Sequence, residues 1–265
     1  MILAVNIGNS RISVGIFDDC GTLSVKFKIS SDIGRTSDEY FSIITSLLRE
    51  NDFDIASVDG VVISSVVPQL TLTVTQTLLR LTHHTPILIG PGVKTGFSIK
   101  IDNPSELGAD MVANAAAVIG RQRKGNGQLS ASIVVDMNTV TTVSAINKNG
   151  EYVGCAIFPG VQMSFDSMHV NTALLPNVML SSPHKAIGKN SQESVRSGVI
   201  YGNAFMLDGF VYRFARELKC KPEELDLTIT GEYAQGILDV CNSKFTYVED
   251  LTLNGLYCIY RNNIK

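Results

Sequence analysis

The chain has 265 residues, which is enough for one large domain or two smaller ones with a hydrophobic core. Apolar residues make up 45% and charged residues 18%, a globular and not a disordered composition. The net charge of −3 and the lack of any Lys/Arg cluster argue against nucleic acid or an anionic membrane as the main partner. No apolar run approaches the roughly 18 residues that span a bilayer. The sequence therefore predicts a cytoplasmic protein.

The cysteines and histidines give no sign of a metal site. The five cysteines are scattered, odd in number and free of CxxC spacing, which is typical of reduced thiols. The four histidines form no HxxxH or HxxE pattern.

The chain begins with three predicted strands, Ile2–Val5, Ile12–Phe17 and Leu23–Ile29. The polar turn Asn6–Ser10 joins the first two. Helical and strand patterns then alternate, which predicts an α/β fold. They comprise a helix behind a capping box at Thr36 and Glu39, a buried strand at Val61–Val66, and a helix through Ala109 and Ile119 that Ser105 is expected to cap.

The second half echoes this start. Apolar Ile133–Val135 is followed by the polar turn Asp136–Thr139, then by predicted strands at Thr141–Ile146 and Tyr152–Phe158. In this pairing Asn6 falls opposite Asp136. The repeat predicts two similar half-domains, residues 1–123 and 131–265, each with a mixed five-stranded sheet.

Two further elements follow, and a linker precedes the second half. Spacing near 3.6 predicts one long helix at Ser191–Leu218, and Leu227–Thr230 predicts a strand. The stretch Lys124–Ser130 is the expected flexible connection between the halves.

The two polar turns are candidate phosphate loops. The backbone at Gly8 can approach a phosphate closely, although Gly8-Asn9 is also ordinary hairpin chemistry. Asp136, followed by Thr139 and further threonines, suits a cation and phosphate oxygens, but Asp and Thr are also common turn formers. One such loop in each half favours the functional interpretation.

Asp110 is the candidate general base. It lies in Gly108-Ala109-Asp110, near the start of a predicted helix. A kinase must accept a proton from the attacking hydroxyl, which a carboxylate there can do. An acid stabilised by the helix dipole, with no catalytic role, is the alternative.

Eight ordered segments give these features a common setting. They are Asn6–Ser10, Ser64–Pro68, Gly92–Gly96, Asn103–Met111, Val135–Thr142, Gly154–Gly160, Thr172–Pro176 and Gly188–Ser191. Together they resemble the type III pantothenate kinases, whose motifs include Asp-x-Gly-Asn-Thr, Gly-Ala-Asp-Arg and Val-Asp-x-Gly-Thr-x-Thr-Thr. The order and spacing match from end to end.

The resemblance implies a ribonuclease-H-like, actin-like ATPase fold and usually a dimer. It implies phosphorylation of the primary hydroxyl of pantothenate by ATP, the first step of coenzyme A biosynthesis, with Mg²⁺ and a monovalent cation, K⁺ or NH₄⁺. Carried over by position, the roles are as follows: Asp110 accepts the proton; Asn6, Gly8, Asn9, Ser10 and Thr139 bind ATP; Gly108, Ala109, Met111, Thr172 and Ser191 bind substrate; Asp136 holds the monovalent cation, and Asn6 the Mg²⁺, directly or through water.

Six positions depart from the family pattern: Asn6 for Asp, Ile101 for Tyr, Met111 for Arg, Asn138 for Gly, Cys155 for Gly and Glu232 for Gly. Asn6 carries no charge for Mg²⁺, and Met111 cannot grip a carboxylate as arginine does. Two hypotheses follow. In one, the chain is a kinase subunit, active as a homodimer or completed by a paralogue in a heterodimer. In the other, it is an inactive regulatory or binding protein on the same scaffold.

Overall fold

The computed structural model describes residues 1–125, 127–181 and 185–264 and divides the chain into two compact units. Unit 1 comprises residues 1–98, 102–124 and 250–265, and unit 2 comprises residues 99–101 and 125–249. The boundary at residue 124 falls at the start of the predicted linker Lys124–Ser130, of which Asn126 lies outside the described residues. No helix in the described part of the chain is both long and apolar enough to cross a membrane.

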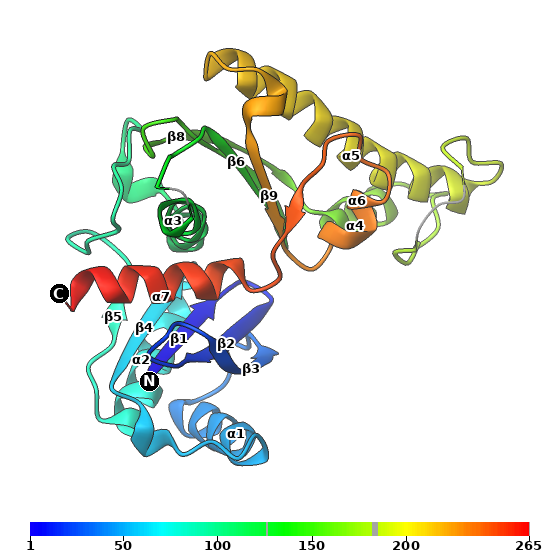
Figure 1. The fold of residues 1–265 in the computed structure, drawn as a ribbon. Helices are drawn as coiled ribbons and strands as arrows, with labels where there is room; N and C mark the ends of the chain where they lie inside the picture. Colours follow the sequence, from blue (N-terminus) through cyan, green and yellow to red (C-terminus); the bar gives the residue numbers. More distant parts are fainter. Residues whose placement is uncertain (126, 182–184, 265) are drawn as a thin grey trace. The chain divides into compact units, whose positions relative to one another are not determined.

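Unit 1 is built on a mixed five-stranded sheet in the order β3-β2-β1-β4-β5 (Figure 1). The first three strands form an antiparallel meander, and β4 and β5 run parallel to β1. Their bounds are β1 Ile2–Ile7, β2 Arg11–Phe17, β3 Leu23–Ser30, β4 Gly60–Ser65 and β5 Ile87–Leu88.

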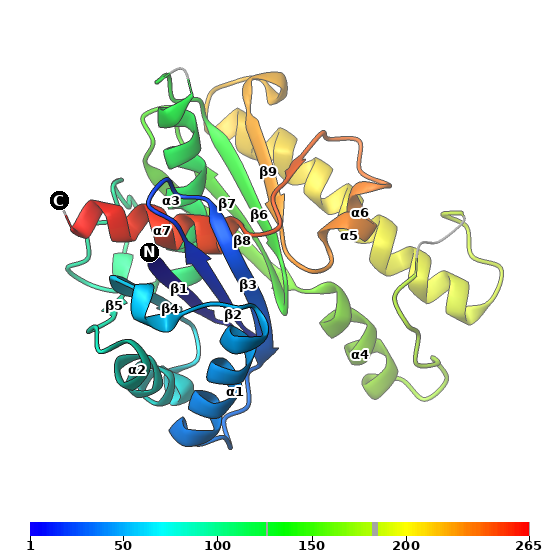
Figure 2. The ribbon, with the colours of Figure 1, turned by 60° about the horizontal axis from the view of Figure 1, so that its bottom comes forward.

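Helices cover both faces of this sheet (Figure 2). The helices are α1 Ser37–Glu50, α2 Pro68–Thr82, α3 Ala109–Lys124 and α7 Leu251–Asn263, with 3₁₀ turns at Ile55–Ser57 and Pro104–Glu106. Alternate side chains of β1, such as Leu3 and Val5, enter a buried cluster with α1 and α2. The opposite face packs against α7, where Tyr257 stacks on Phe17 with ring centroids 4.9 Å apart.

The capping box of α1 is confirmed, whereas the predicted cap of α3 is wrong. Thr36 Oγ1 accepts a hydrogen bond from Glu39 N, and the Glu39 side chain accepts one from Thr36 N at 2.7 Å. Ser105 lies instead inside the 3₁₀ turn that Asn103 caps, and α3 begins only at Ala109. Asn103 takes the capping role because its side-chain oxygen accepts from Ser105 N.

Unit 2 repeats the topology of unit 1. Its sheet has the order β10-β9-β6-β7-β8, with β7 and β8 antiparallel and β9 and β10 parallel, as in unit 1. The strands are β6 Ser132–Met137, β7 Val140–Ile146, β8 Tyr152–Pro159, β9 Asp226–Thr230 and β10 Thr246–Tyr247. The prediction of two similar five-stranded mixed sheets is thereby confirmed.

The helices of unit 2 pack on one face of its sheet. They are α4 Val161–Asn171, α5 Ser191–Glu217 and α6 Ala234–Leu238, with a 3₁₀ turn at Pro222–Glu224. Val135, Val199 and Ile237 belong to the buried cluster that joins β6, α5 and α6. The long helix predicted at Ser191–Leu218 is therefore α5.

The end of the chain belongs to unit 1, although residues 131–265 were expected as one half-domain. Close packing of α7 against α3 and β4 explains why the end of the chain belongs to unit 1. A side chain at Gly255 would collide with the backbone of Ala113 in α3, and one at Gly60 would collide with the Tyr260 ring. Lys26 and Asp250 add an ion pair of 2.9 Å at the start of the helix.

Candidate active site

The turn after β1 is a tight hairpin. Gly8 N donates to Arg11 O at 3.0 Å, and the Ser31 hydroxyl donates to Gly8 O at 2.5 Å. A Cβ at position 8 would lie 3.1 Å from Arg11 O, so the turn favours glycine. Asn9 and Ser10 are exposed at its tip. The segment is therefore a hairpin turn with exposed polar residues at its tip.

Asn6, the residue before the last of β1, carries a side-chain oxygen that accepts no hydrogen bond from the described residues. It pairs in register with Ser13 on β2 and Ser64 on β4. Among the described residues, buried Asn6 Oδ1 and buried Ser64 Oγ have no hydrogen-bond partner. Such an acceptor costs free energy unless something satisfies it. Magnesium, which takes oxygen ligands and keeps waters, fits Asn6 Oδ1 as a neutral ligand, and Asn6 would hold it directly or through water.

Asp136 occupies the equivalent place in unit 2. It lies fifth in β6 as Asn6 does in β1, and pairs with Thr142 on β7 and Thr230 on β9. The correspondence of Asn6 with Asp136 predicted from the repeat is confirmed. Thr139 follows in the turn to β7, partly exposed.

Asn138 makes two hydrogen bonds across this site. Its Nδ2 donates to Asp136 Oδ1 at 2.5 Å, and its Oδ1 accepts from Glu232 N at 3.3 Å. Two of the positions that depart from the family pattern, 138 and 232, are thus joined to each other and to Asp136. The Asn138 amide thus gives Asp136 Oδ1 a hydrogen-bond donor at the place where the resemblance implies a monovalent cation.

Two glycines pack closely against the turn between β6 and β7. A Cβ at Gly160 would collide with the carbonyl oxygens of Asn138 and Thr139. Gly231 has φ +104°, and a Cβ there would lie 2.5 Å from backbone atoms of Met137. The turn is therefore held between two backbone segments that approach more closely than any side chain permits.

Asp110 lies in the first turn of α3, in unit 1. Burial raises the pKa of its carboxyl, although Met111 N donates to Asp110 Oδ1 at 2.8 Å and acts in the opposite direction. A raised pKa makes the carboxylate a better proton acceptor. A Cβ at Gly108 would lie 2.7 Å from Asp110 Oδ1, so glycine gives the carboxylate its room.

The remaining substrate candidates have different surroundings. Met111 is only 7% exposed and Ala109 is buried, so their side chains offer little surface to a ligand. Thr172 is the C-cap of α4, where its hydroxyl donates to Met168 O at 2.7 Å. Ser191 is exposed at the first position of α5, next to the capping residue Asn190.

The predicted residues fall into one set for each unit. Asn6, Gly8, Asn9, Ser10 and the segment Gly108–Met111 lie in unit 1. Asp136, Thr139, Thr172 and Ser191 lie in unit 2. Within unit 2 the structure places Asp136 and Thr139 on one hairpin, and Thr172 and Ser191 at the ends of two successive helices.

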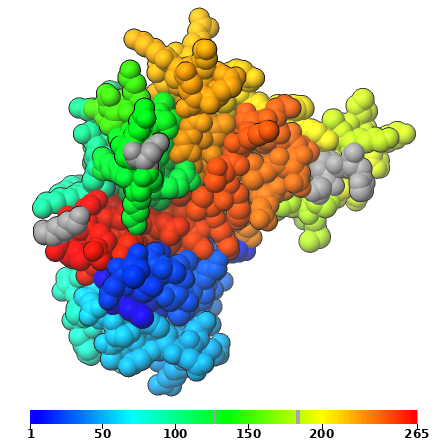
Figure 3. All heavy atoms as spheres, in the orientation of Figure 1, coloured from blue at the N-terminus to red at the C-terminus, as the bar shows by residue number. Residues whose placement is uncertain are grey.

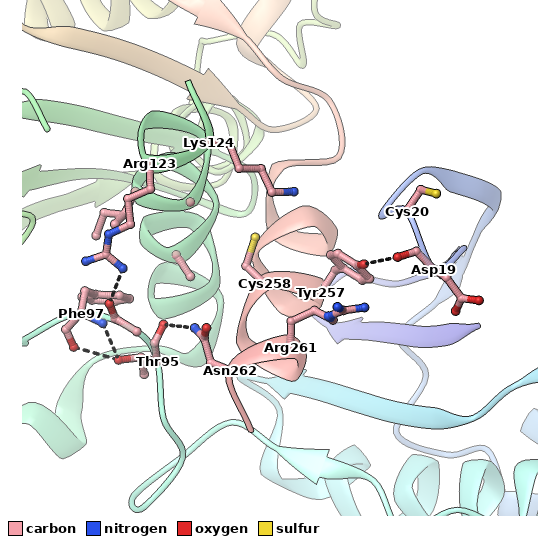
Figure 4. A pocket seen from close by; sticks show the side chains of 14 residues that line it. Asp19, Cys20, Thr95, Phe97, Arg123, Lys124, Tyr257, Cys258, Arg261 and Asn262 are labelled. Carbon is pink, nitrogen blue, oxygen red and sulfur yellow. Dashed lines mark hydrogen bonds between the residues drawn. The ribbon is translucent and has the colours of Figure 1, made fainter. Parts of the chain in front are cut away.

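A separate cavity of about 400 Å³ lies in unit 1, beside the last turns of α3 and α7 (Figure 4). Its lining includes Arg123, Lys124, Tyr257, Cys258 and Arg261. None of the predicted site residues lines it, and it adjoins the opposite end of α3 from Asp110. Sequence reasoning missed this cavity because its residues come from four separated segments.

Sequence reasoning also missed the bond between Asn138 and Asp136. The one available signal was their spacing, because side chains two apart at a strand end can meet across a tight turn.

Solved structures with a similar fold define the class. A Campylobacter jejuni protein assigned provisionally to the Baf family of transcriptional activators matches with a TM-score of 0.60 and 16% identity, over 99% of this chain and 98% of that one. A Sinorhizobium meliloti protein provisionally described as a 2-dehydro-3-deoxygalactonokinase matches with a TM-score of 0.58 and 10% identity, over 99% of both chains. The fold is that of the actin-like ATPases and sugar kinases.

Sequence comparison then gives the family. The family model for type III pantothenate kinase matches residues 2–213. The type III pantothenate kinase of Anaeromyxobacter sp. (strain Fw109-5) is 38% identical over 99% of this chain and 100% of its own length. That of Halalkalibacterium halodurans is 34% identical over the full length of both. The chain belongs to the type III pantothenate kinase family.

Proposed function

We propose that this chain phosphorylates pantothenate with ATP, giving 4'-phosphopantothenate, and that it does so as a subunit completed by a paralogue in a heterodimer. The observation that carries the proposal is the full-length match to type III pantothenate kinases, together with a carboxylate at position 110 whose pKa burial raises. Pantothenate phosphorylation opens coenzyme A biosynthesis, and a cytoplasmic setting suits that role.

In the proposed reaction Asp110 accepts the proton of the primary hydroxyl of pantothenate as its oxygen attacks the γ-phosphorus of ATP. The bond from that phosphorus to the bridging oxygen breaks, and ADP leaves. The polar tip at Gly8, Asn9 and Ser10, together with Thr139, contacts the phosphates. Asn6 would hold Mg²⁺, directly or through water, and the bound ion would offset the charge of the phosphates. Gly108, Ala109, Met111, Thr172 and Ser191 border the substrate, Met111 through its backbone.

Unit 2 offers a surface for pairing. The described residues between α4 and α5 (yellow-green in Figure 3) expose large apolar side chains, with Leu174 at 92%. On α5, Gly198, Gly202, Phe205, Gly209 and Tyr212 recur at spacings of four and three, and both aromatic rings are exposed. Beyond the neighbouring backbone of α5 itself, no atom of the described residues lies within 4 Å of a Cβ built at any of these glycines, so each can receive a side chain from a partner helix.

Regulation without catalysis is the second candidate. Position 111 holds a buried methionine and therefore no charged group for the pantothenate carboxylate, and Glu232 adds a carboxylate on the loop that contacts Asn138. In this role the chain would bind a family paralogue and change its activity without turning over substrate.

The deciding experiment is ATP-dependent phosphorylation of pantothenate by the purified chain, with and without a paralogue that keeps Asp, Arg and Gly at the altered positions. Product is identified by mass and ADP by a coupled assay. Phosphopantothenate formed only by the mixture supports the subunit role. A stable mixed species without added activity supports the regulatory role.

A further inference from the structure

The orientation of the Asn138 amide is fixed by its two partners. A backbone N–H can only donate, so the atom that faces Glu232 N is the oxygen, and the NH₂ group faces Asp136. A hydrogen bond of 2.5 Å to a carboxylate is charge-assisted and places partial positive charge against Asp136 Oδ1.

A neighbouring backbone contact makes this arrangement stiff. Tyr233 N donates to Met137 O at 3.2 Å, and Gly160 and Gly231 pack against the same turn. The backbone that carries the Asn138 side chain is therefore rigid. The two hydrogen bonds of this side chain connect the end of β6 to the loop after β9.

We propose that Asn138 replaces a bound monovalent cation, so that neither the fold of this loop nor the activity of this chain depends on K⁺ or NH₄⁺. A cation beside an aspartate supplies positive charge and draws neighbouring acceptors together. The Asn138 amide supplies partial positive charge to Asp136 and also bonds the Glu232 loop. A cation at Oδ1 would meet the amide hydrogens, which repel it.

The activity part of this inference rests on the proposed function, but its stability part does not. Asn138→Gly removes the amide and opens the space to an ion. Asn138→Asp replaces the donor with a second carboxyl group beside Asp136, so that either one of the two binds a proton or a cation offsets their charge. Asn149→Gly is the matched control, since Asn149 is an exposed residue of the turn that joins β7 to β8.

The test is thermal unfolding of the purified chain in KCl, NH₄Cl and choline chloride at one ionic strength. Wild type and Asn149→Gly should give the same Tm in all three salts. Both position-138 variants should unfold earlier in choline and recover in KCl or NH₄Cl by a few degrees, of the order of the 2–4 °C that a modest stabilisation gives a chain of this size.

Two results overturn the inference: a K⁺- or NH₄⁺-specific rise in the Tm of the wild type, or no salt response in either position-138 variant. Salt-dependent turnover by a wild-type species that is active would also overturn it. Absence of turnover in every salt by the chain mixed with its paralogue counts against the proposed function and leaves the thermal result intact.

Discussion

At the scale of single residues, burial of Asp110 favours proton acceptance but lowers the stability of the folded chain. Its pKa is raised because burial disfavours the ionised form. The ionised carboxylate therefore lowers the free energy of unfolding. This destabilisation is absent well below the unfolded pKa and grows as pH rises from the unfolded pKa to the higher folded pKa. Ionisation of Asp110 thus destabilises the fold, and glycine at position 108 leaves room for its carboxylate. Both features are typical of a functional site.

We predict that Asp110→Asn lowers kcat at least about 100-fold in whichever species is active, the low end for a general base. The same change should raise the free energy of unfolding at pH 7, because asparagine keeps the hydrogen bond from Met111 N and never ionises. Steady-state kinetics and urea unfolding measure the two effects. In the wild type, kcat should fall as pH decreases through the raised pKa.

Asp102→Asn is the control for this change, since Asp102 is an exposed acid nearby in unit 1. It should alter neither quantity by much. An unchanged kcat in Asp110→Asn would remove Asp110 from the mechanism, whatever its effect on stability.

At the scale of elements, Asp208 fastens α5 to the segment after α6. Asn242 N, Asn242 Nδ2 and Ser243 N donate to its carboxylate at 2.8–3.0 Å. Burial is the largest single influence and would raise the pKa, but the bonds from Ser243 and Asn242 together outweigh it and hold the pKa of Asp208 below its usual value. The stabilisation is therefore present above the unfolded pKa and is lost as pH falls through the folded pKa.

We predict that Asp208→Asn lowers the free energy of unfolding by about 1–3 kcal/mol at pH 7, because buried donors lose a charged acceptor. The difference from wild type should shrink as pH falls from the unfolded pKa toward the lower folded pKa, below which the wild-type carboxylate is protonated as well. Urea unfolding at several pH values measures this. Asp239→Asn, at an exposed acid in the same unit, should show no such difference.

Two glycines of unit 2 offer a direct comparison. A Cβ at Gly231, where φ is +104°, would lie 2.5 Å from the Met137 backbone. A Cβ at Gly236 in α6 would have no atom of the described residues within 4 Å apart from the neighbouring helix backbone. Gly231→Ala should cost about 1–3 kcal/mol or more of unfolding free energy, since strain and collision add. Gly236→Ala should be neutral or slightly stabilising. Chemical denaturation of both variants checks the prediction, and equal effects would contradict it.

Sequence patterns predicted the elements whose signal is local. The echo of strand, polar turn and strand predicted both sheets and the match of Asn6 with Asp136, because alternation and turn residues act within a few positions. The return of α7 to unit 1 was not predictable in this way. It depends on Gly255 and Gly60 admitting α3 and Tyr260, contacts between segments far apart in sequence.

The candidate site shows the same limit. Family motifs located Asp110 and the two turns. They showed Asn138 only as a departure from the family's glycine and predicted no role for its side chain. Its bonds to Asp136 and Glu232 N appear once the strands are paired. Likewise, the burial of Met111 follows from how α3 packs and not from its motif.

At the scale of the whole molecule, changes to chemistry coexist with an intact scaffold. The altered positions fall in both units, with Asn6 and Met111 in unit 1 and Glu232 in unit 2. Yet Gly160 and Gly231, which the turn after β6 requires, are kept. A chain that retains its fold while losing charged groups at its site fits a subunit kept for pairing.

The pairing surface can be tested separately from activity. Phe205→Glu places a charge on the exposed face of α5 at the centre of the spacing of glycines and aromatic residues. It should abolish association measured by sedimentation while leaving the monomer folded, since Phe205 is 56% exposed. The variant then serves as the control for the assembly prediction below.

We predict that the chain alone shows little pantothenate-dependent ATP turnover and that activity appears when it is co-purified with a family paralogue as a 1:1 species. Losses at Asn6, Ile101, Met111 and Glu232 of about 1.4 kcal/mol each would approach 10⁴-fold if independent, although neighbouring sites rarely add cleanly. A partner that supplies the missing groups can restore the activity. Robust turnover by the homodimer would show that these positions matter less than their chemistry suggests, and an inactive mixed dimer would favour regulation. Because Phe205→Glu removes pairing without touching Asp110, it should abolish the restored activity in the mixture, which separates completion by a partner from turnover by the paralogue alone.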